Sequence, residues 1–229
     1  MDFSPTLPAA VLWDLDGTLI DSEPYWIGAE TDLAGRFGVE WTQADGLSLV
    51  GNPLRLSALR LQERGVDMAT DDIIEHLLQR VTDQVRTHTP WQSDARGLLN
   101  QVVSAGIPCA LVTMSYASLA TAAITRIPDA FAAVVTGDEV SRGKPHPESY
   151  LMAADRLGVA ITDCVAIEDS PSGVAAAYAS GARTIAVKRL TPLIARSGLS
   201  RVHNLDSIGL SELESIARGR TIDELGSDT

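Results

Sequence analysis

Two aspartates separated by one residue follow a short apolar run near the start of the chain. The run begins at Ala10 and ends in Asp14, Leu15 and Asp16, directly before a glycine and a threonine. An apolar run bounded by a turn signal is typical of a buried strand that delivers its last residues to a loop. Strand alternation then points Asp14 and Asp16 to the same side. Two such carboxylates repel each other unless a cation lies between them. From these residues alone, a helix cap or a solvated acidic turn is the favoured interpretation, and a cation-assisted site is the alternative that the rest of the sequence must decide.

Other polar residues follow later apolar runs in the same way. Thr113 ends one apolar strand, and Glu168 and Asp169 end another, while Lys144 lies in a Gly-Lys-Pro-His-Pro loop between a strand and a helix. Taken singly, they could be a helix cap, an acidic turn and a solvated charge. In an open parallel sheet, however, ligands bind outside the carboxyl ends of the strands. We therefore expect these side chains to form one site with the aspartate pair.

The elements that must position these residues alternate between strand and helix over most of the chain. This alternation favours the α/β class, with a Rossmann-like parallel sheet flanked by helices. The segment 21–88 carries helical periodicity alone, starting at a helix signature in which Ser22 is a candidate cap. We therefore expect an α/β core domain of residues 1–20 and 89–229 with an inserted all-helical cap domain of residues 21–88. Residues 219–229 are expected to form a polar, frayed tail. The expected strands after the first are 107–112, 131–135, 164–167 and 183–187.

Composition narrows the class of partner. The chain has 229 residues, of which 45% are hydrophobic, and a net charge of −12. That charge offers no basic stripe for nucleic acid. Cys109 and Cys164 lie in apolar runs and are expected to be buried thiols. No stretch predicts a signal peptide or a membrane span, so we expect a cytoplasmic protein with no membrane or nucleic-acid partner. The oligomeric state is left open, with a monomer as the expectation.

Four segments together resemble the motifs of the haloacid dehalogenase superfamily. They are DLDGT, the strand ending in Thr113, the GKPHP loop and the IEDSPSG segment, and the resemblance spans Val11 to about Val187. The helical insertion after the first motif is similar to the subclass with a small helical cap, which includes β-phosphoglucomutases and sugar phosphatases. The resemblance implies an α/β core that carries the chemistry under a helical lid.

The resemblance also implies a role for each matching residue. Asp14 would be the nucleophile that forms an aspartyl-phosphate, and Asp16 the general acid and then the general base. Thr113 and the backbone amide of Met114 would bind the phosphoryl oxygens. Lys144 would neutralise the nucleophile and the transferred group.

A magnesium ion is the implied cofactor. Its ligands would be Asp14, the backbone carbonyl of Asp16, and Asp169, since Mg²⁺ takes few carboxylates and keeps several waters. Glu168 would act through water or orient the site rather than bind the ion.

The predicted activity is therefore a magnesium-dependent phosphatase for a small phosphorylated substrate, most plausibly a sugar phosphate. Asp16 argues against a dehalogenase, because a halide leaving group needs no proton. Two alternatives stay open: a β-phosphoglucomutase-like isomerase and a phospho-accepting, receiver-like signalling module. For substrate specificity, the candidate cap residues are Trp26, Gly51 and Arg55.

Overall fold

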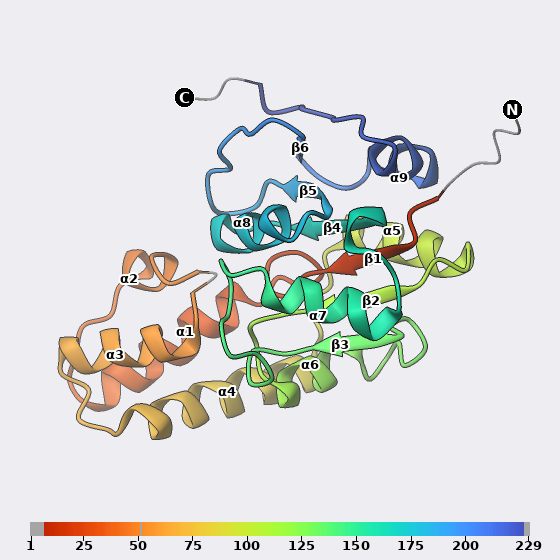
Figure 1. Ribbon diagram of the computed structural model, residues 1–229. Helices are drawn as coiled ribbons and strands as arrows, with labels where there is room; N and C mark the ends of the chain where they lie inside the picture. Colours follow the sequence, from red (N-terminus) through yellow and green to blue (C-terminus); the bar gives the residue numbers. More distant parts are fainter. Residues whose placement is uncertain (1–6, 51, 227–229) are drawn as a thin grey trace, which may run out of the picture.

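A parallel six-stranded sheet forms the centre of the protein (Figure 1). The computed structural model describes residues 7–50 and 52–226. Within them the strands follow the order β3-β2-β1-β4-β5-β6, which confirms the predicted Rossmann-like α/β class. The first strand of the chain is therefore central, between the strand that ends at Val112, just before Thr113, and the strand that ends at Glu168. The strand bounds are β1 (Ala10–Trp13), β2 (Cys109–Val112), β3 (Ala133–Val135), β4 (Cys164–Glu168), β5 (Arg183–Val187) and β6 (Leu199–Val202).

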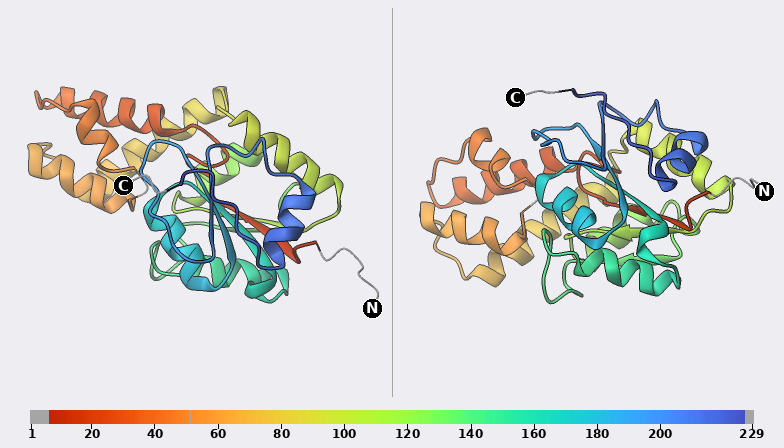
Figure 2. Two further views of the ribbon diagram at one scale, coloured as in Figure 1. Left: turned by 90° about the horizontal axis from the view of Figure 1, so that it is seen from above. Right: turned by 45° about the horizontal axis from the view of Figure 1, so that its top comes forward.

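Helices cover both faces of this sheet (Figure 2). Alternation along β1 separates the two faces, because Leu12 packs in one apolar cluster and Trp13 in the other. Trp13 is fully buried on the face opposite Asp14, as the strand period predicts. The helices over the Leu12 face are α7 (Glu148–Leu157) and α8 (Pro171–Ser180), with the 3₁₀ turn η1 (Ile161–Asp163) beside α7. The helices over the Trp13 face are α5 (Ser93–Ser104), α6 (Ala117–Ile124) and α9 (Leu210–Ala217).

The regular elements that the structure describes between residues 21 and 88 are all helices. They are α1 (Glu23–Arg36), α2 (Gln43–Leu47), α3 (Leu54–Arg64) and α4 (Thr70–Thr87). They lie at the end of the sheet toward which the strands run (Figure 1). Their buried residues belong to the same apolar cluster as the Trp13 face, and α4 also packs against α6. The helices therefore stand where a lid over the strand ends would stand, and the domain boundaries stay a prediction.

The carboxyl-terminal segment differs from the expected frayed tail. The backbone N–H of Arg201 in β6 donates to Ile222 O at 2.7 Å, and that of Glu224 donates to Arg201 O at 2.9 Å. Leu225 is buried, and the Arg201 guanidinium pairs with Asp223 at 2.8 Å. Residues 222–226 thus continue the packing along the edge strand, while 227–229 lie outside the described residues. The composition of this segment did not predict the contact, because much of it consists of backbone hydrogen bonds between residues far apart in the sequence.

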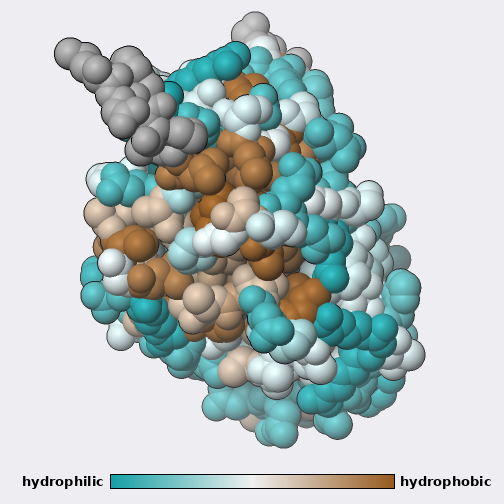
Figure 3. All heavy atoms as spheres, turned by 90° about the vertical axis from the view of Figure 1, so that its right-hand side faces the viewer, coloured by the Kyte–Doolittle hydropathy of each residue, from teal (hydrophilic) through white to brown (hydrophobic). Residues whose placement is uncertain are grey.

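The end of the molecule opposite the cap carries apolar side chains surrounded by polar ones (Figure 3). Exposed apolar residues such as Val103, 38% exposed, are ordinary at protein surfaces. No helix in the described ranges is both long enough and apolar enough to cross a membrane.

Candidate active site

Strand register aligns the acidic residues at the carboxyl edge of the sheet. Trp13, the last residue of β1, is paired with Ile167 of β4. The next residues, Asp14 and Glu168, therefore reach the edge at the same level. The Asp14 N–H donates to Ile167 O at 3.1 Å, which ties the start of the loop to β4. On the other side, β2 presents the carbonyl of Val112 at this level.

Lys144 occupies the point where these three strands end. Its Nζ lies 2.6 Å from Asp14 Oδ1 and 2.6 Å from Glu168 Oε1, and it donates to Val112 O at 2.9 Å. All three charged side chains are buried. Burial alone would lower the pKa of Lys144, but the two carboxylates outweigh it and hold the pKa above its ordinary value. Lys144 therefore stays charged beside the predicted nucleophile.

Glu168 is fixed by its neighbours rather than left free in the cleft. Its Oε1 accepts from the Tyr150 hydroxyl at 2.8 Å, and its Oε2 accepts from the Asp169 N–H at 3.2 Å and the Ser170 hydroxyl at 3.3 Å. Gly173, in the first turn of α8, packs so closely that a Cβ there would overlap the Glu168 carboxylate. The glycine of the IEDSPSG segment thus lets the helix close on this side chain.

Three carboxylates meet beside Lys144 in a cluster that could hold a metal ion. One oxygen from each of Asp14, Glu168 and Asp169 lies within 4.8 Å of the other two, and all three residues are buried. Thr18 Oγ1 donates to Asp169 Oδ1 at 3.0 Å. Gly17 has a φ of +87°, and a Cβ there would overlap Asp169. The DGT turn therefore needs glycine both for its backbone conformation and for space.

The electrostatics of this cluster favour a cation. Burial raises the pKa of Asp14 and of Asp169 well above the ordinary value, and the charge of Glu168 adds to this rise in both. Lys144 lowers the pKa of both aspartates, but it is a single positive charge beside three carboxylates. Hard oxygen ligands of this kind suit Mg²⁺ or Ca²⁺, so the donor set fits a divalent cation.

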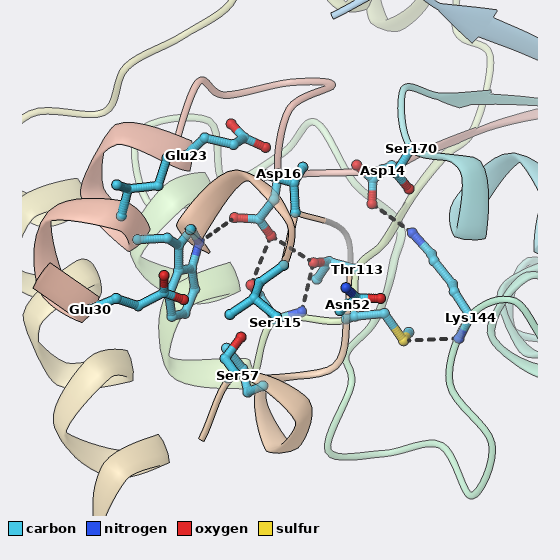
Figure 4. A pocket seen from close by; sticks show the side chains of 17 residues that line it. Asp14, Asp16, Glu23, Glu30, Asn52, Ser57, Thr113, Ser115, Lys144 and Ser170 are labelled. Carbon is cyan, nitrogen blue, oxygen red and sulfur yellow. Dashed lines mark hydrogen bonds and ion pairs between the residues drawn. The ribbon is translucent and has the colours of Figure 1, made fainter. Parts of the chain in front are cut away.

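The Asp16 side chain turns away from this cluster toward the cap (Figure 4). Its Oδ1 accepts from the Ser22 hydroxyl at 2.6 Å and from Trp26 Nε1 at 3.3 Å. Its Oδ2 accepts from Ser115 Oγ at 2.7 Å and Thr113 Oγ1 at 3.2 Å. Donors from the start of α1 and from the loop after β2 thus hold one carboxylate. Ser22 stands at the N-cap position of α1, as expected, but its side chain makes no cap bond and donates to Asp16 instead.

Of the remaining predicted residues, Trp26 and Met114 line the same cleft as the aspartates. Met114 Sδ accepts the backbone N–H of Lys144 at 3.2 Å, so this side chain also supports the lysine loop. Gly51 lies outside the described residues. The structure therefore brings every described core-motif residue to one place.

Arg55 is not brought to the cleft. Its side chain is 67% exposed and pairs with Asp71 at 3.5 Å on the outer side of the cap. Its helix neighbours Leu54 and Ser57 do line the cleft. A helix turns about 100° per residue, so Leu54 and Ser57, three apart, share a face that Arg55 does not. The expected substrate contact of Arg55 finds no support in this placement.

Two cap glutamates line the cleft and were missed by sequence reasoning. Burial, with the charge of Asp16, raises the pKa of Glu23 to about 8. Burial raises the pKa of Glu30 to about 7. Their spacing of seven residues places both on the face of α1 that carries Trp26. That periodicity was the signal available in the sequence.

The comparisons with known proteins agree with this geometry. The family model for haloacid dehalogenase-like hydrolases matches residues 11–187. The chain belongs to this haloacid dehalogenase-like hydrolase family, which confirms the resemblance seen in the motifs. It is 36% identical over 184 residues to Hexitol phosphatase A of Escherichia coli, covering 77% of this chain and 81% of that protein. It is 30% identical over 187 residues to Fructose-1-phosphate phosphatase YqaB of the same organism, covering 80% and 97%.

A solved structure shares the fold. CbbY from Rhodobacter sphaeroides, solved in complex with phosphate, aligns with a TM-score of 0.82 at 23% identity. The alignment covers 91% of this chain and all of that one. At this identity the likeness concerns the arrangement of the core and its helical block.

Proposed function

We propose that this protein is a magnesium-dependent phosphatase that hydrolyses a sugar or polyol monophosphate through an aspartyl-phosphate on Asp14. The observation that carries this proposal is that two neighbouring carboxylates, Asp14 and Asp16, have different surroundings. Asp14 is buried against the Lys144 ammonium at 2.6 Å, whereas Asp16 is held by four donors at the cap side of the cleft. We infer that Asp14 attacks phosphorus and that Asp16 exchanges a proton with the leaving group.

The reaction proceeds in two balanced steps. In the first, an Asp14 carboxylate oxygen attacks phosphorus, the bond from phosphorus to the ester oxygen breaks, and Asp16 donates a proton to that oxygen as the alcohol leaves. In the second, water attacks the phosphorus of the aspartyl-phosphate, Asp16 takes a proton from that water, and the bond to Asp14 breaks. Inorganic phosphate and the free alcohol are the products.

The remaining residues position the phosphoryl group. Lys144 neutralises charge on Asp14 and on the transferred group, and Thr113 with the backbone amide of Met114 would bind the phosphoryl oxygens. Lys144 Nζ engages Asp14 Oδ1, which leaves the other carboxylate oxygen for attack. Phosphoryl transfer depends mainly on such positioning and charge neutralisation.

Magnesium would be held by Asp14, Asp169 and the backbone carbonyl of Asp16, with Glu168 orienting the site. When bound, the ion supplies positive charge against the phosphoryl oxygens and the clustered carboxylates. Two of these ligands, Asp14 and Asp169, belong to the buried oxygen cluster described above, which supports their part of the assignment.

The charge of the cleft restricts the substrate. Among the described residues that line it, Lys144 is the sole cation, while Asp14, Asp16, Glu23 and Glu30 are acidic. A second phosphate or a carboxylate on the substrate would find no lining cation besides Lys144, which is already paired with Asp14. A monophosphate with a neutral, hydroxylated remainder fits, in keeping with the sugar and hexitol phosphatases among the relatives.

The two alternatives have less support. A receiver-like module does not accord with membership of a hydrolase family, and an isomerase does not accord with the phosphatases found as relatives. An isomerase would return the phosphoryl group to the bound sugar faster than water takes it. Measuring free phosphate against isomer formation from a hexose 1-phosphate distinguishes the two activities.

Phosphate release from a panel of monophosphates, with p-nitrophenyl phosphate as a generic ester, tests the proposal. We expect wild-type protein with Mg²⁺ to release phosphate, and Asp14→Asn to lose at least about 10³-fold in turnover because the nucleophile is gone. A folded Asp14→Asn protein with unchanged activity would exclude the aspartyl-phosphate. No release from any ester by wild-type protein would exclude the phosphatase.

A further inference from the structure

A buried carboxylate lies at the cap end of the cleft, away from the phosphoryl chemistry. Glu30 projects from α1, and Figure 4 places it on the opposite side of Asp16 from Asp14 and Lys144. Its side chain lines the cleft together with Ser57 of α3. The cleft therefore has acidic side chains at both ends, and its lining also includes the apolar side chains of Trp26 and Ile27.

Glu30 is buried without a cation. Only 3% of its surface is exposed, and it takes part in none of the ion pairs found among the described residues. Its Oε2 accepts from Trp41 Nε1 at 3.2 Å, and the neighbouring Ser57 side chain lowers the pKa of Glu30 against the effect of burial. Burying a charged group in this way is unfavourable for folding unless it is paired. Groups that destabilise the fold in this way are often retained for function.

The Trp41 donor orients Glu30 but does not saturate it. An ionised carboxylate offers about four acceptor positions, and the Trp41 N–H fills one of them. Gly46 of α2 packs against the same side chain, since a Cβ there would lie 3.3 Å from Glu30 Oε2 and 2.8 Å from Ile27 Cγ1. α2 thus closes over the carboxylate and confines what can reach it. The free acceptor positions belong to a side chain that lines the cleft.

We propose that Glu30, oriented by Trp41, is a specificity subsite that accepts a hydrogen bond from a hydroxyl of the substrate's alcohol portion. This inference rests on the proposed phosphatase function and deepens it, because it names the chemistry that selects the leaving group. Phosphate and carboxylate groups are repelled at this end, apolar groups leave the carboxylate unsatisfied, and a polyol hydroxyl satisfies it. A hydrogen bond to a charged group is worth about 10- to 150-fold in affinity.

Glu30→Gln tests the subsite, because it keeps the size of the side chain and an acceptor for Trp41 while removing the charge. Steady-state kinetics are measured with a hexitol 6-phosphate and with p-nitrophenyl phosphate, whose alcohol portion carries no hydroxyl to bind. We expect kcat/KM for the hexitol phosphate to fall about 10-fold or more, mainly through KM. For p-nitrophenyl phosphate we expect a change within about twofold.

Matched variants and a binding measurement separate this role from a general effect on folding. Glu75→Gln makes the same change at an exposed position of α4 and should leave both substrates unaffected. In the inactive Asp14→Asn background, calorimetry should show weaker binding of the hexitol phosphate when Glu30→Gln is added. A series of deoxy-hexitol phosphates, each lacking one hydroxyl, should identify the hydroxyl that Glu30 binds. The analogue that lacks this hydroxyl should have the same kcat/KM with wild-type protein and with Glu30→Gln.

Two results would overturn the subsite. Equal losses on both substrates would mean that Glu30 is structural, and no loss on the hexitol phosphate would mean that it does not contact substrate. In either case, hydrolysis of p-nitrophenyl phosphate by wild-type protein would leave the proposed phosphatase intact. If wild-type protein hydrolyses no ester, the proposed function fails, and the calorimetric comparison still decides whether Glu30 binds the polyol.

Discussion

The Lys144 ammonium lies 2.6 Å from the Asp14 carboxylate, although 130 residues separate them in the chain. Both side chains are buried, and Glu168 completes a carboxylate–ammonium–carboxylate arrangement. The ammonium opposes the rise that burial causes in the pKa of Asp14, so the lysine both prepares the nucleophile and stabilises the fold around it.

Lys144→Met should therefore destabilise the protein as well as inactivate it. Removing the ammonium leaves Asp14 and Glu168 buried without their partner, at a cost of about 3–5 kcal/mol in the free energy of unfolding. Denaturant unfolding at pH 7 measures this loss. Lys188→Met, at an exposed lysine, is the matched control and should change stability by less than about 0.5 kcal/mol. Equal stability of the two variants would show that the buried pairing contributes nothing.

Asp16→Asn should reduce steady-state turnover by roughly 10²–10⁴-fold, the range typical of a lost acid–base group. With p-nitrophenyl phosphate the loss should fall mainly on the second step, because p-nitrophenolate leaves without protonation whereas water still needs a base. Stopped-flow measurements should then show a burst of p-nitrophenol followed by slow turnover. Loss of the burst in a folded variant would contradict the separate roles of the two aspartates.

Removing the divalent cation should stop hydrolysis, and Mg²⁺ should restore it. Binding to the buried carboxylates should also raise the melting temperature, with about 2.7 kcal/mol of added stability at 100 times Kd. Asp169→Asn removes one carboxylate of the cluster, so its melting temperature should respond to Mg²⁺ only at higher concentration. Full activity of wild-type protein in excess chelator would reject the magnesium site.

Glu30→Gln should be more stable than wild type at high pH. The pKa of Glu30 is raised from 4.5 to about 7 by burial, so the folded protein holds this proton more tightly than the unfolded chain does. Stability is therefore lost as the pH rises from about 4.5 through 7, and the variant avoids this loss. We expect a gain of roughly 1–3 kcal/mol at pH 8 and none at pH 4, measured by denaturant unfolding. A pH-independent difference from wild type would contradict the buried charge.

The core of the site could be predicted because its residues sit at the ends of locally recognisable strands. Asp14, Thr113 and Asp169 each follow a short apolar run, and parallel strands bring such ends to one edge whatever the details of packing. The family motifs add roles to these positions. The same reasoning predicted the helical segment after β1, because helical periodicity is a local property.

What the sequence determined by itself was therefore the set of residues at the sheet edge, and only the tertiary structure decided how their side chains are used. The direction of the Asp16 carboxylate depends on Ser22 and Ser115, which come from different elements. The exposure of Arg55 and the burial of Glu30 depend on which helix face meets the cleft, a matter of packing between distant segments. Hydrogen bonds and burial of this kind join residues far apart in sequence, and no local pattern encodes them.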